Sequence, residues 1–351
     1  MPLSGSFFSK TFVFGFDART SRGSMRDKRS WFIRIFDARN PSVVGVGECG
    51  PLPGLSVDDV SYFETTLADV LQRVAGQEVP SDIEQWVRSI VPVGFPSITF
   101  GLETALLDLV HGGKRLLFDN DFVRGVSIPI NGLVWMNDVE SMLRQANQLV
   151  DRGFSCIKIK VGGCDFEEEC SMLRAFRSAH KKDQITLRLD ANGAFAPDEA
   201  LEKLNRLSEF GVHSIEQPIK AGLSEMPDIC KKSPIPIALD EELIGREGEK
   251  DALLNIIKPA FIVLKPTLHG GMLHAREWIS KAEERGIGWW ITSALESSIG
   301  LNAIGQFVSS YNPTIPQGLG TGSIYTNNIK SPLKVVRGSL MSDPQGSWEP
   351  L

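Results

Sequence analysis

The sequence has few cysteines and no long apolar run. None of its five cysteines forms a Cys-x-x-Cys pair. A disulfide framework or a zinc site is therefore not expected, and reduced thiols favour a cytoplasmic protein. No stretch approaches the ~20 uncharged apolar residues that a membrane span needs, so we expect no membrane insertion. The N-terminus lacks the basic and apolar regions of a signal peptide.

Basic charge is not in excess either. Lys plus Arg is 37 and Asp plus Glu is 43, which gives a net charge of −6. Proteins that bind nucleic acids or anionic membranes carry basic patches, so neither partner is expected. From residue 127 onward no Gly-x-Gly-x-x-Gly loop follows a strand-like run, which argues against a dinucleotide-binding sheet there. We expect a small-molecule partner, and a homo-oligomer is compatible with the sequence.

Strand-like and helical segments alternate from about residue 127 onward. Each short β-branched run is followed by a polar loop, an amphipathic stretch and a glycine. The strand-like runs are 127–133, 156–160, 186–190, 214–216, 235–239, 261–264, 288–292 and a weaker one near Ile315, with helical stretches at 138–152, 166–179, 197–210 and 271–285. Seven or eight such units fit a closed β/α barrel, whereas an open doubly wound sheet usually has fewer.

The first ~110 residues show a different pattern, which indicates an α+β module. Two antiparallel strands are predicted at 11–16 and 31–36, and a polar, basic loop over 17–30 joins them. A loop of this length is usually disordered or serves as a lid. A third strand at 43–48 and helices at 60–74 and 98–110 complete the module.

Four charged residues end successive strand-like runs at an even spacing. Asp190, Glu216, Asp240 and Lys265 follow one another at intervals of 24 to 26 residues, about one β/α unit each. This period places them at one mouth of the barrel, where barrel active sites lie. Three carboxylates there would repel unless a cation neutralised them, and hard oxygen ligands suit Mg²⁺, with Mn²⁺ as a substitute. Charged residues also end strands by chance, but the even period favours a metal site.

Two lysines, Lys158 and Lys160, lie on the same side of the second predicted barrel strand. Lysines are costly in a core, so a pair that faces the interior suggests a function. Mutual repulsion and a nearby dication would lower a lysine's pKa, so that it could act as a base near neutral pH. A metal with lysines on either side can remove a proton next to a substrate carboxylate. The alternative, two surface lysines, is weakened by Lys265 across the mouth.

As a set, the motifs resemble the muconate-lactonizing subgroup of the enolase superfamily. They are Lys158-Ile159-Lys160, Asp190-Ala191-Asn192, Glu216-Gln217-Pro218, Asp240-Glu241 and Lys265-Pro266, with the segment 45–53 (GVGECGPLP) similar to the capping-domain signature. The resemblance covers essentially the whole chain. It implies an N-terminal α+β capping domain over 1–118, a (β/α)7β TIM-like barrel over 119–325, and a tail over 326–351 that packs back on the capping domain.

Within this subgroup the activities differ, and include cycloisomerisation, epimerisation, racemisation and dehydration. The segments 292–307 and 317–328 are similar to those of the o-succinylbenzoate synthases of menaquinone biosynthesis. Dipeptide epimerases usually carry an Asp-x-Asp pair after the seventh strand, and the segment 293–297 (SALES) has none. The resemblance therefore implies Mg²⁺-dependent dehydration of 2-succinyl-6-hydroxycyclohexa-2,4-diene-1-carboxylate to o-succinylbenzoate. An N-succinylamino-acid racemase, a dipeptide epimerase and a non-catalytic barrel remain as alternatives.

The resemblance also implies roles for the matching residues. Asp190, Glu216 and Asp240 would bind Mg²⁺. Lys160 would remove the α-proton, Lys265 would stand on the opposite face, and Lys158 would give electrostatic support. Position in the chain adds Glu241 as a partner of a neighbouring lysine behind the metal ligands, and as candidate substrate contacts Arg188, Asn192, Ser293, Ser297, Gly322 and, in the N-terminal loop, Thr20, Ser21 and Arg22. A loop cap at Asn192, an interior place for Arg188 and a plain exposed loop at 20–22 are the alternatives.

Overall fold

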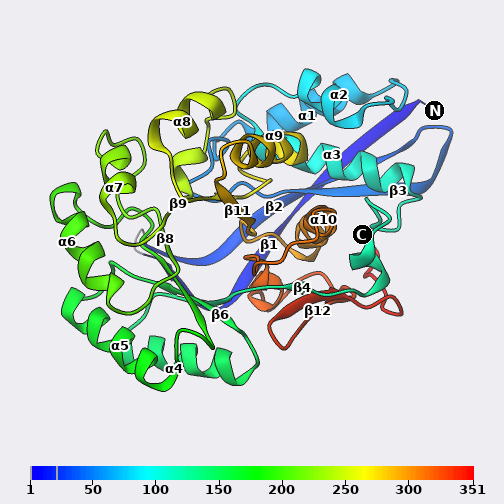
Figure 1. The fold of residues 1–351 in the computed structure, drawn as a ribbon. Coiled ribbons are helices and arrows are strands. Elements are labelled where there is room, and N and C mark those ends of the chain that lie inside the picture. Colours follow the sequence, from blue (N-terminus) through cyan, green and yellow to red (C-terminus); the bar gives the residue numbers. More distant parts are fainter. Residues whose placement is uncertain (1, 21–22) are drawn as a thin grey trace.

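The computed structural model describes residues 2–20 and 23–351, and its N-terminal module is an antiparallel sheet covered by helices (Figure 1). The sheet order is β1-β2-β3. Helix α3 packs closely on β3, because a Cβ at Gly47 would lie 1.9 Å from the carbonyl oxygen of Gly101, so only glycine allows this approach. The elements of this module are β1 (Leu3–Thr20), β2 (Gly23–Asp37), β3 (Asn40–Cys49), α1 (Phe63–Val74), α2 (Ile83–Ile90) and α3 (Pro96–Val110).

The predicted loop is wrong over 17–20 and 23–30, because β1 runs to Thr20 and β2 begins at Gly23 in a two-stranded ribbon. After a register shift between Val13 and Ala18, pairing resumes with Ala18 opposite Met25. The segment was predicted as a loop because it is rich in polar residues. In a strand, however, successive side chains face opposite sides, so polar residues can alternate with buried ones. On β2, Lys28 and Ser30 are buried while the arginine between them is exposed.

The barrel is built on a seven-stranded parallel sheet, which confirms the alternating β/α pattern. Its order is β11-β10-β9-β8-β7-β6-β5, and helices cover its outer face (Figure 1). Its strands are β5 (Gly132–Val134), β6 (Cys156–Lys160), β7 (Thr186–Asp190), β8 (Ser214–Glu216), β9 (Ile237–Leu239), β10 (Phe261–Leu264) and β11 (Gly288–Ile291). Its helices are α4 (Val139–Asp151), α5 (Phe166–Ala179), α6 (Pro197–Ser208), α7 (Met226–Lys232), α8 (Lys250–Ile257), α9 (Gly271–Glu283) and α10 (Ser298–Ser309).

Two residues take the place of an eighth strand. Gln317 bridges Ile130 and Gly318 bridges Thr292, both in parallel. The backbone N–H of Gln317 donates to Pro129 at 2.8 Å, and that of Gly318 donates to Ile291 at 2.8 Å. The weak strand predicted near Ile315 is thus reduced to two residues, which join β11 to the segment 129–130 just before β5.

The C-terminal tail contacts both the barrel and the N-terminal module. Its hairpin, β12 (Leu333–Val336) and β13 (Ser339–Ser342), pairs with the short strand β4 (Ile128–Pro129). Trp348 and Leu351 pack against the apolar cluster that contains Phe12 and Phe32 of the N-terminal ribbon. The tail therefore joins two parts of the chain that are distant in sequence.

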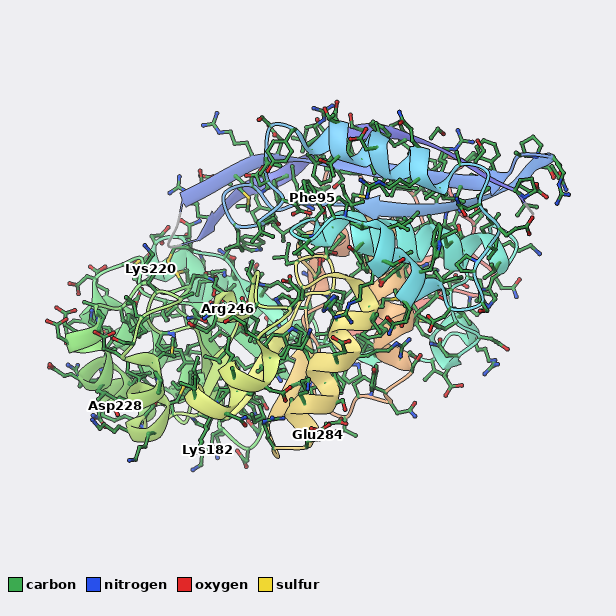
Figure 2. All side chains as sticks on the ribbon, turned by 90° about the horizontal axis from the view of Figure 1, so that it is seen from above. Phe95, Lys182, Lys220, Asp228, Arg246 and Glu284 are labelled. Atoms are coloured by element: carbon green, nitrogen blue, oxygen red, sulfur yellow. The ribbon has the colours of Figure 1, made fainter. Side chains whose placement is uncertain are left out.

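The end of the barrel at which its strands finish faces the N-terminal module. In Figure 2, Lys220 and Arg246, which follow β8 and β9, lie on the side near the module, whereas Lys182, Asp228 and Glu284 lie at the other end. Over the described ranges, no helix combines the length and apolarity required to cross a bilayer. All five cysteines in those ranges are free thiols.

Candidate active site

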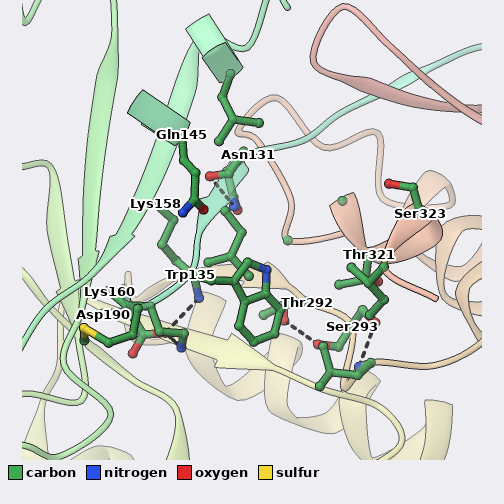
Figure 3. Close-up of a pocket in the computed structure, with 18 of the residues that line it drawn as sticks. Asn131, Trp135, Gln145, Lys158, Lys160, Asp190, Thr292, Ser293, Thr321 and Ser323 are labelled. Carbon is green, nitrogen blue, oxygen red and sulfur yellow. Dashed lines mark hydrogen bonds and ion pairs between the residues drawn. The ribbon is translucent and has the colours of Figure 1, made fainter. Parts of the chain in front are cut away.

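A cavity of about 440 Å³ lies at the C-terminal ends of the barrel strands (Figure 3). From the N-terminal ribbon, Phe16, Asp17 and Met25 line it, so the ribbon covers the barrel mouth. Figure 3 shows Lys158, Lys160 and Asp190 on one side of Trp135, and Thr292, Ser293 and Thr321 on the other. The charged and amide residues that line the cavity from the strand ends are Lys158, Lys160, Asp190, Asn192, Asp240 and Lys265.

Strand register brings the predicted metal ligands together. Lys160 is paired with Asp190, and Asp190 with Glu216. Glu216 is paired with Ala238 of β9. Asp240 lies two residues after Ala238, so its side chain is on the same face of the sheet as that of Glu216. Because β6 and β10 are separated by three strands, Lys160 and Lys265 stand on opposing sides of the mouth.

Each lysine forms an ion pair with a carboxylate. The Nζ of Lys158 lies 2.7 Å from Oε2 of Glu216 and 3.1 Å from Oδ2 of Asp190. The Nζ of Lys160 is 2.9 Å from the same Asp190 oxygen, and that of Lys265 is 2.6 Å from both Asp240 oxygens. All these side chains are at most 11% exposed, so the interactions act where water screens them little.

Neighbouring carboxylates set the direction of the pKa shifts of Lys158 and Lys265. Burial lowers the pKa of Lys158, but Glu216 and Asp190 outweigh burial and raise it above its usual range. The pKa of Lys265 is likewise raised, because Asp240 and Glu241 together outweigh burial. The charges of the chain therefore favour the ammonium forms of Lys158 and Lys265.

The carboxylates fit a hard cation. Burial and the charges of Asp190 and Asp240 raise the pKa of Glu216 to about 7, despite the opposing effect of Lys158. The Oε1 atom of Glu216 is buried and has no hydrogen-bond partner. Within the described ranges, no group of three acidic, His or Cys side chains is already arranged to hold a metal ion. The predicted ligands are instead paired with lysine ammonium groups. An oxygen-only set with an unpaired buried oxygen suits Mg²⁺ or Mn²⁺.

Asn192 links Lys160 to Glu241, the acid predicted to lie behind the metal ligands. Its Oδ1 accepts a 2.6 Å hydrogen bond from Lys160, and its Nδ2 donates to Oε1 of Glu241 at 2.9 Å. The backbone φ of Asn192 is +47°, a left-handed conformation that asparagine tolerates. Glu241 also helps to raise the pKa of Lys265, so it acts on both lysines from behind the cavity.

Three predicted substrate contacts lie off the cavity wall. Arg188 is buried in the barrel interior, where its guanidinium stacks 4.0 Å from the Trp290 ring centroid and donates to the Pro316 carbonyl at 2.9 Å. Ser297 caps α10 and donates its hydroxyl to Glu48 at 2.6 Å. Gly322 is flanked by Thr321 and Ser323, which line the cavity while Gly322 itself does not.

The remaining candidates divide between the wall and the ribbon tip. Ser293 lines the cavity, and its hydroxyl donates to Glu296. Thr20 ends β1 in backbone pairing with Gly23. Ser21 and Arg22 lie outside the described residues, so their predicted role is not tested.

Sequence reasoning missed several apolar and hydroxyl residues of the wall. Trp135 directly follows β5, so its place after a barrel strand was a usable signal. Thr292 likewise follows β11. Phe16 and Met25 come from the ribbon, whose length had suggested a lid, although the predicted contacts in it were Thr20, Ser21 and Arg22.

Comparisons with known proteins bear on this geometry. Residues 141–346 match the family model described as enolase C-terminal domain-like. The chain is 43% identical to the o-succinylbenzoate synthase of Desulfotalea psychrophila, over 95% of this chain and 98% of that one. The crystal structure of MenC from D. psychrophila superposes with a TM-score of 0.86 at 40% identity, and covers 97% of this chain and 100% of that one. A dipeptide epimerase from Cytophaga hutchinsonii, crystallised with Mg and D-Ala-L-Val, shares the fold with a TM-score of 0.84 at 21% identity, over 99% and 96% of the two chains.

Proposed function

The chain belongs to the enolase superfamily and, within its muconate-lactonizing subgroup, to the o-succinylbenzoate synthase family of lyases, and from that premise we propose its reaction. It dehydrates 2-succinyl-6-hydroxycyclohexa-2,4-diene-1-carboxylate to o-succinylbenzoate, in the cytoplasm and within menaquinone biosynthesis. The observation that carries this proposal is the pair of opposed lysines around three carboxylates, next to a cavity wall that presents no acid from the loop after β11.

Lys160 acts as the base on the α-carbon of the substrate. Its Nζ lies at the cavity surface, and Asp190 and Asn192 fix its position by two hydrogen bonds. The neutral amine takes the α-proton, and the C–H electron pair moves toward the substrate carboxylate. The resulting ammonium returns a proton to the departing hydroxyl on the same face, which leaves as water. The ring becomes aromatic, and all atoms of the substrate are recovered in o-succinylbenzoate and water.

Lys265 and Lys158 act as cations in this reaction, and each is paired with a carboxylate. Lys265 stands on the opposite face, where its charge stabilises the anionic intermediate. Lys158 lies beside both Asp190 and Glu216 and holds the carboxylate oxygens in place. The two cations also favour a substrate that carries two carboxylates.

Asp190, Glu216 and Asp240 would hold the divalent cation, Mg²⁺ with Mn²⁺ as a substitute. When bound, the cation supplies positive charge to the substrate carboxylate and so makes the α-proton more acidic. It also supplies the positive charge that a neutral Lys160 requires.

The main alternative is an N-succinylamino-acid racemase or a dipeptide epimerase, because Lys160 and Lys265 are placed as opposed bases would be. The loop after β11 favours the synthase over the dipeptide epimerase, whose substrate carries a free ammonium group. Its acid, Glu296, is fully buried and accepts hydrogen bonds from Thr267, Ser293 and the N–H of Ala294. No acidic group of this loop is therefore available to bind a substrate ammonium.

Incubation in D₂O separates the two functions. The purified enzyme with Mg²⁺ receives either the cyclohexadiene or an N-succinylamino acid and a dipeptide. The proposal predicts aromatic product from the first and slow or no α-deuteration of the others. Rapid α-deuteration with racemisation, and no dehydration, would contradict it.

A further inference from the structure

Lys28 is a buried lysine that takes no part in the proposed chemistry. It lies on β2 with 1% of its surface exposed. Its Nζ donates to the carbonyl oxygen of Leu295, 3.1 Å away in the loop after β11. Burial lowers the pKa of Lys28, and the nearby carboxylates of Glu48 and Glu296 oppose that shift. A buried ammonium is costly unless it is paired and hydrogen-bonded, so this placement needs a reason.

The N-terminal module leaves space for this ammonium. A Cβ at Gly50 would lie 2.7 Å from the Nζ of Lys28 and 3.3 Å from the hydroxyl of Ser30. Any larger residue at position 50 would displace the lysine from Leu295. Two separate positions of the module therefore serve one contact to the barrel.

Leu295, the residue that Lys28 contacts, has a strained backbone. Its φ is +63°, in the left-handed region that a branched side chain rarely adopts. Such a conformation persists only where the surroundings fix it. Two donors converge on the Leu295 carbonyl, the ammonium of Lys28 and the hydroxyl of Tyr325, which lies 2.6 Å away.

Buried carboxylates fix the rest of the same loop. Glu296 accepts from Thr267, Ser293 and the N–H of Ala294. Glu48, at the end of β3, accepts from the N–H and hydroxyl of the helix-capping serine after Glu296, at 3.0 and 2.6 Å. The loop is thus held from the barrel side by Glu296 and from the N-terminal module by Lys28 and Glu48.

This loop is a wall of the catalytic cavity. Ser293, Ala294 and Leu295 all line it. Ser293 lies on the side of Trp135 away from Lys160 (Figure 3). A substrate whose α-carbon is at Lys160 and which extends across the cavity meets this wall. The position of the Leu295 carbonyl therefore affects how much room the substrate side chain has.

We propose that Lys28 is a positioning residue, whose hydrogen bond to Leu295 sets the shape of the Ser293–Leu295 wall and thereby the affinity for the succinyl side chain of the substrate. The proposal rests on the proposed synthase function. Lys28 touches neither the substrate nor the lysine bases. Its effect is on substrate binding and not on proton transfer.

The test compares Lys28→Met with Lys28→Arg in steady-state synthase assays. Methionine keeps the length and removes the donor, so we expect KM to rise about tenfold while kcat changes less than about threefold, the pattern of lost binding. Arginine keeps a cation that can reach the carbonyl, and should restore most of the KM. Lys10→Met, on the neighbouring strand and without a contact to the loop, serves as the matched control and should leave both constants unchanged.

A second variant decides the matter if Lys28→Met does not fold. Tyr325→Phe removes the other donor to the same carbonyl and changes no charge, so it should also raise KM with little effect on kcat. If Lys28→Met folds, a KM within twofold of wild type would overturn the positioning role. If only Tyr325→Phe folds, the same result in that variant would overturn it. A fall in kcat with unchanged KM would overturn it as well. An inactive wild-type enzyme would instead contradict the proposed function, so the two failures are distinguishable.

Discussion

Three ammonium groups and three carboxylates share the barrel mouth, and their balance is the main feature at the scale of residues. Lys158, Lys160 and Lys265 each pair with an acid on a neighbouring strand. A dication bound by the acids would take over part of this pairing. Lys160 would then be freed to act as a base, while its hydrogen bond to Asn192 keeps it in place.

Lys160→Ala should lower kcat by about 10²–10⁴-fold, because the general base is lost. KM should change little, since the other charged groups of the cavity remain. The exposed Lys232, which pairs only with Asp228 on its own helix, supplies the matched Lys232→Ala control with unchanged kinetics. Undiminished turnover in Lys160→Ala would refute the assigned mechanism.

Asp58 gives a prediction for the pH dependence of stability. Burial raises its pKa to about 6, although Ser97 opposes the shift by donating two hydrogen bonds to it. A carboxyl with a raised folded-state pKa favours the fold when protonated. Its contribution is complete below about pH 4 and is lost as pH rises through 6, by on the order of 3 kcal/mol.

Asp58→Asn should remove that dependence. The unfolding free energy of the variant, measured with urea between pH 4 and 7, should therefore rise relative to wild type as the pH increases. A difference between the two proteins that stays constant over this range would show that folding does not raise the pKa of Asp58.

The sequence identified the charged residues of the site but not the neutral wall. Carboxylates and lysines at strand ends are expensive without a function, so their type and period were informative. Ser297 lies off the cavity wall, because a polar side chain near a site can equally satisfy a buried partner. Arg188 takes the interior place that was its alternative. Glu48 and Trp290, which bind them, are distant in sequence and only the fold brings them together.

At the scale of elements, the barrel closes through single residues in place of a full strand. The Oε1 of Gln317 accepts from the N–H of Ile291 at 2.8 Å, and its Nε2 donates to the carbonyl of Ile315 at 2.8 Å. Its side chain is fully buried. One glutamine thus replaces hydrogen bonds that a longer eighth strand would make.

Gln317→Ala should cost about 2–3 kcal/mol of unfolding free energy, because it leaves the buried Ile291 N–H without an acceptor. The exposed Gln85→Ala on α2 should change stability by no more than about 0.5 kcal/mol. Urea unfolding of both variants provides the comparison. Equal stabilities would mean that the closure does not depend on this side chain.

Element boundaries were predicted well where the pattern was regular. The strands at 156–160, 186–190, 214–216 and 261–264 appear with the predicted limits, since buried β-branched runs in a parallel sheet have sharp ends. The ribbon over 17–20 and 23–30 was missed because its exposed polar residues resemble a loop. Pairing with a partner strand, which one sequence segment does not reveal, makes it a strand.

At the scale of the whole molecule, the N-terminal module and the barrel form one site. The ribbon contributes Phe16, Asp17 and Met25 to the cavity, and the barrel supplies the charges. Period and motif predicted both parts and their order along the chain. They did not predict how the ribbon extends over the mouth, because that depends on contacts such as the one between Phe14 and Tyr325.

Metal binding should stabilise the whole fold, since it relieves repulsion among the acids that raises the pKa of Glu216. At a Mg²⁺ concentration 100 times Kd the expected gain is about 2.7 kcal/mol. Asp240→Asn should largely abolish the rise in Tm, whereas Asp228→Asn, at an exposed acid, should retain it. A rise that NaCl of equal ionic strength reproduces would argue against a specific site.

The central claim is tested most directly by turnover of 2-succinyl-6-hydroxycyclohexa-2,4-diene-1-carboxylate with the metal removed and restored. The account predicts that the purified enzyme forms o-succinylbenzoate in Mg²⁺, loses this activity in EDTA, and regains it when Mg²⁺ is added back. Absence of the aromatic product in Mg²⁺, or equal turnover with and without the metal, would contradict it.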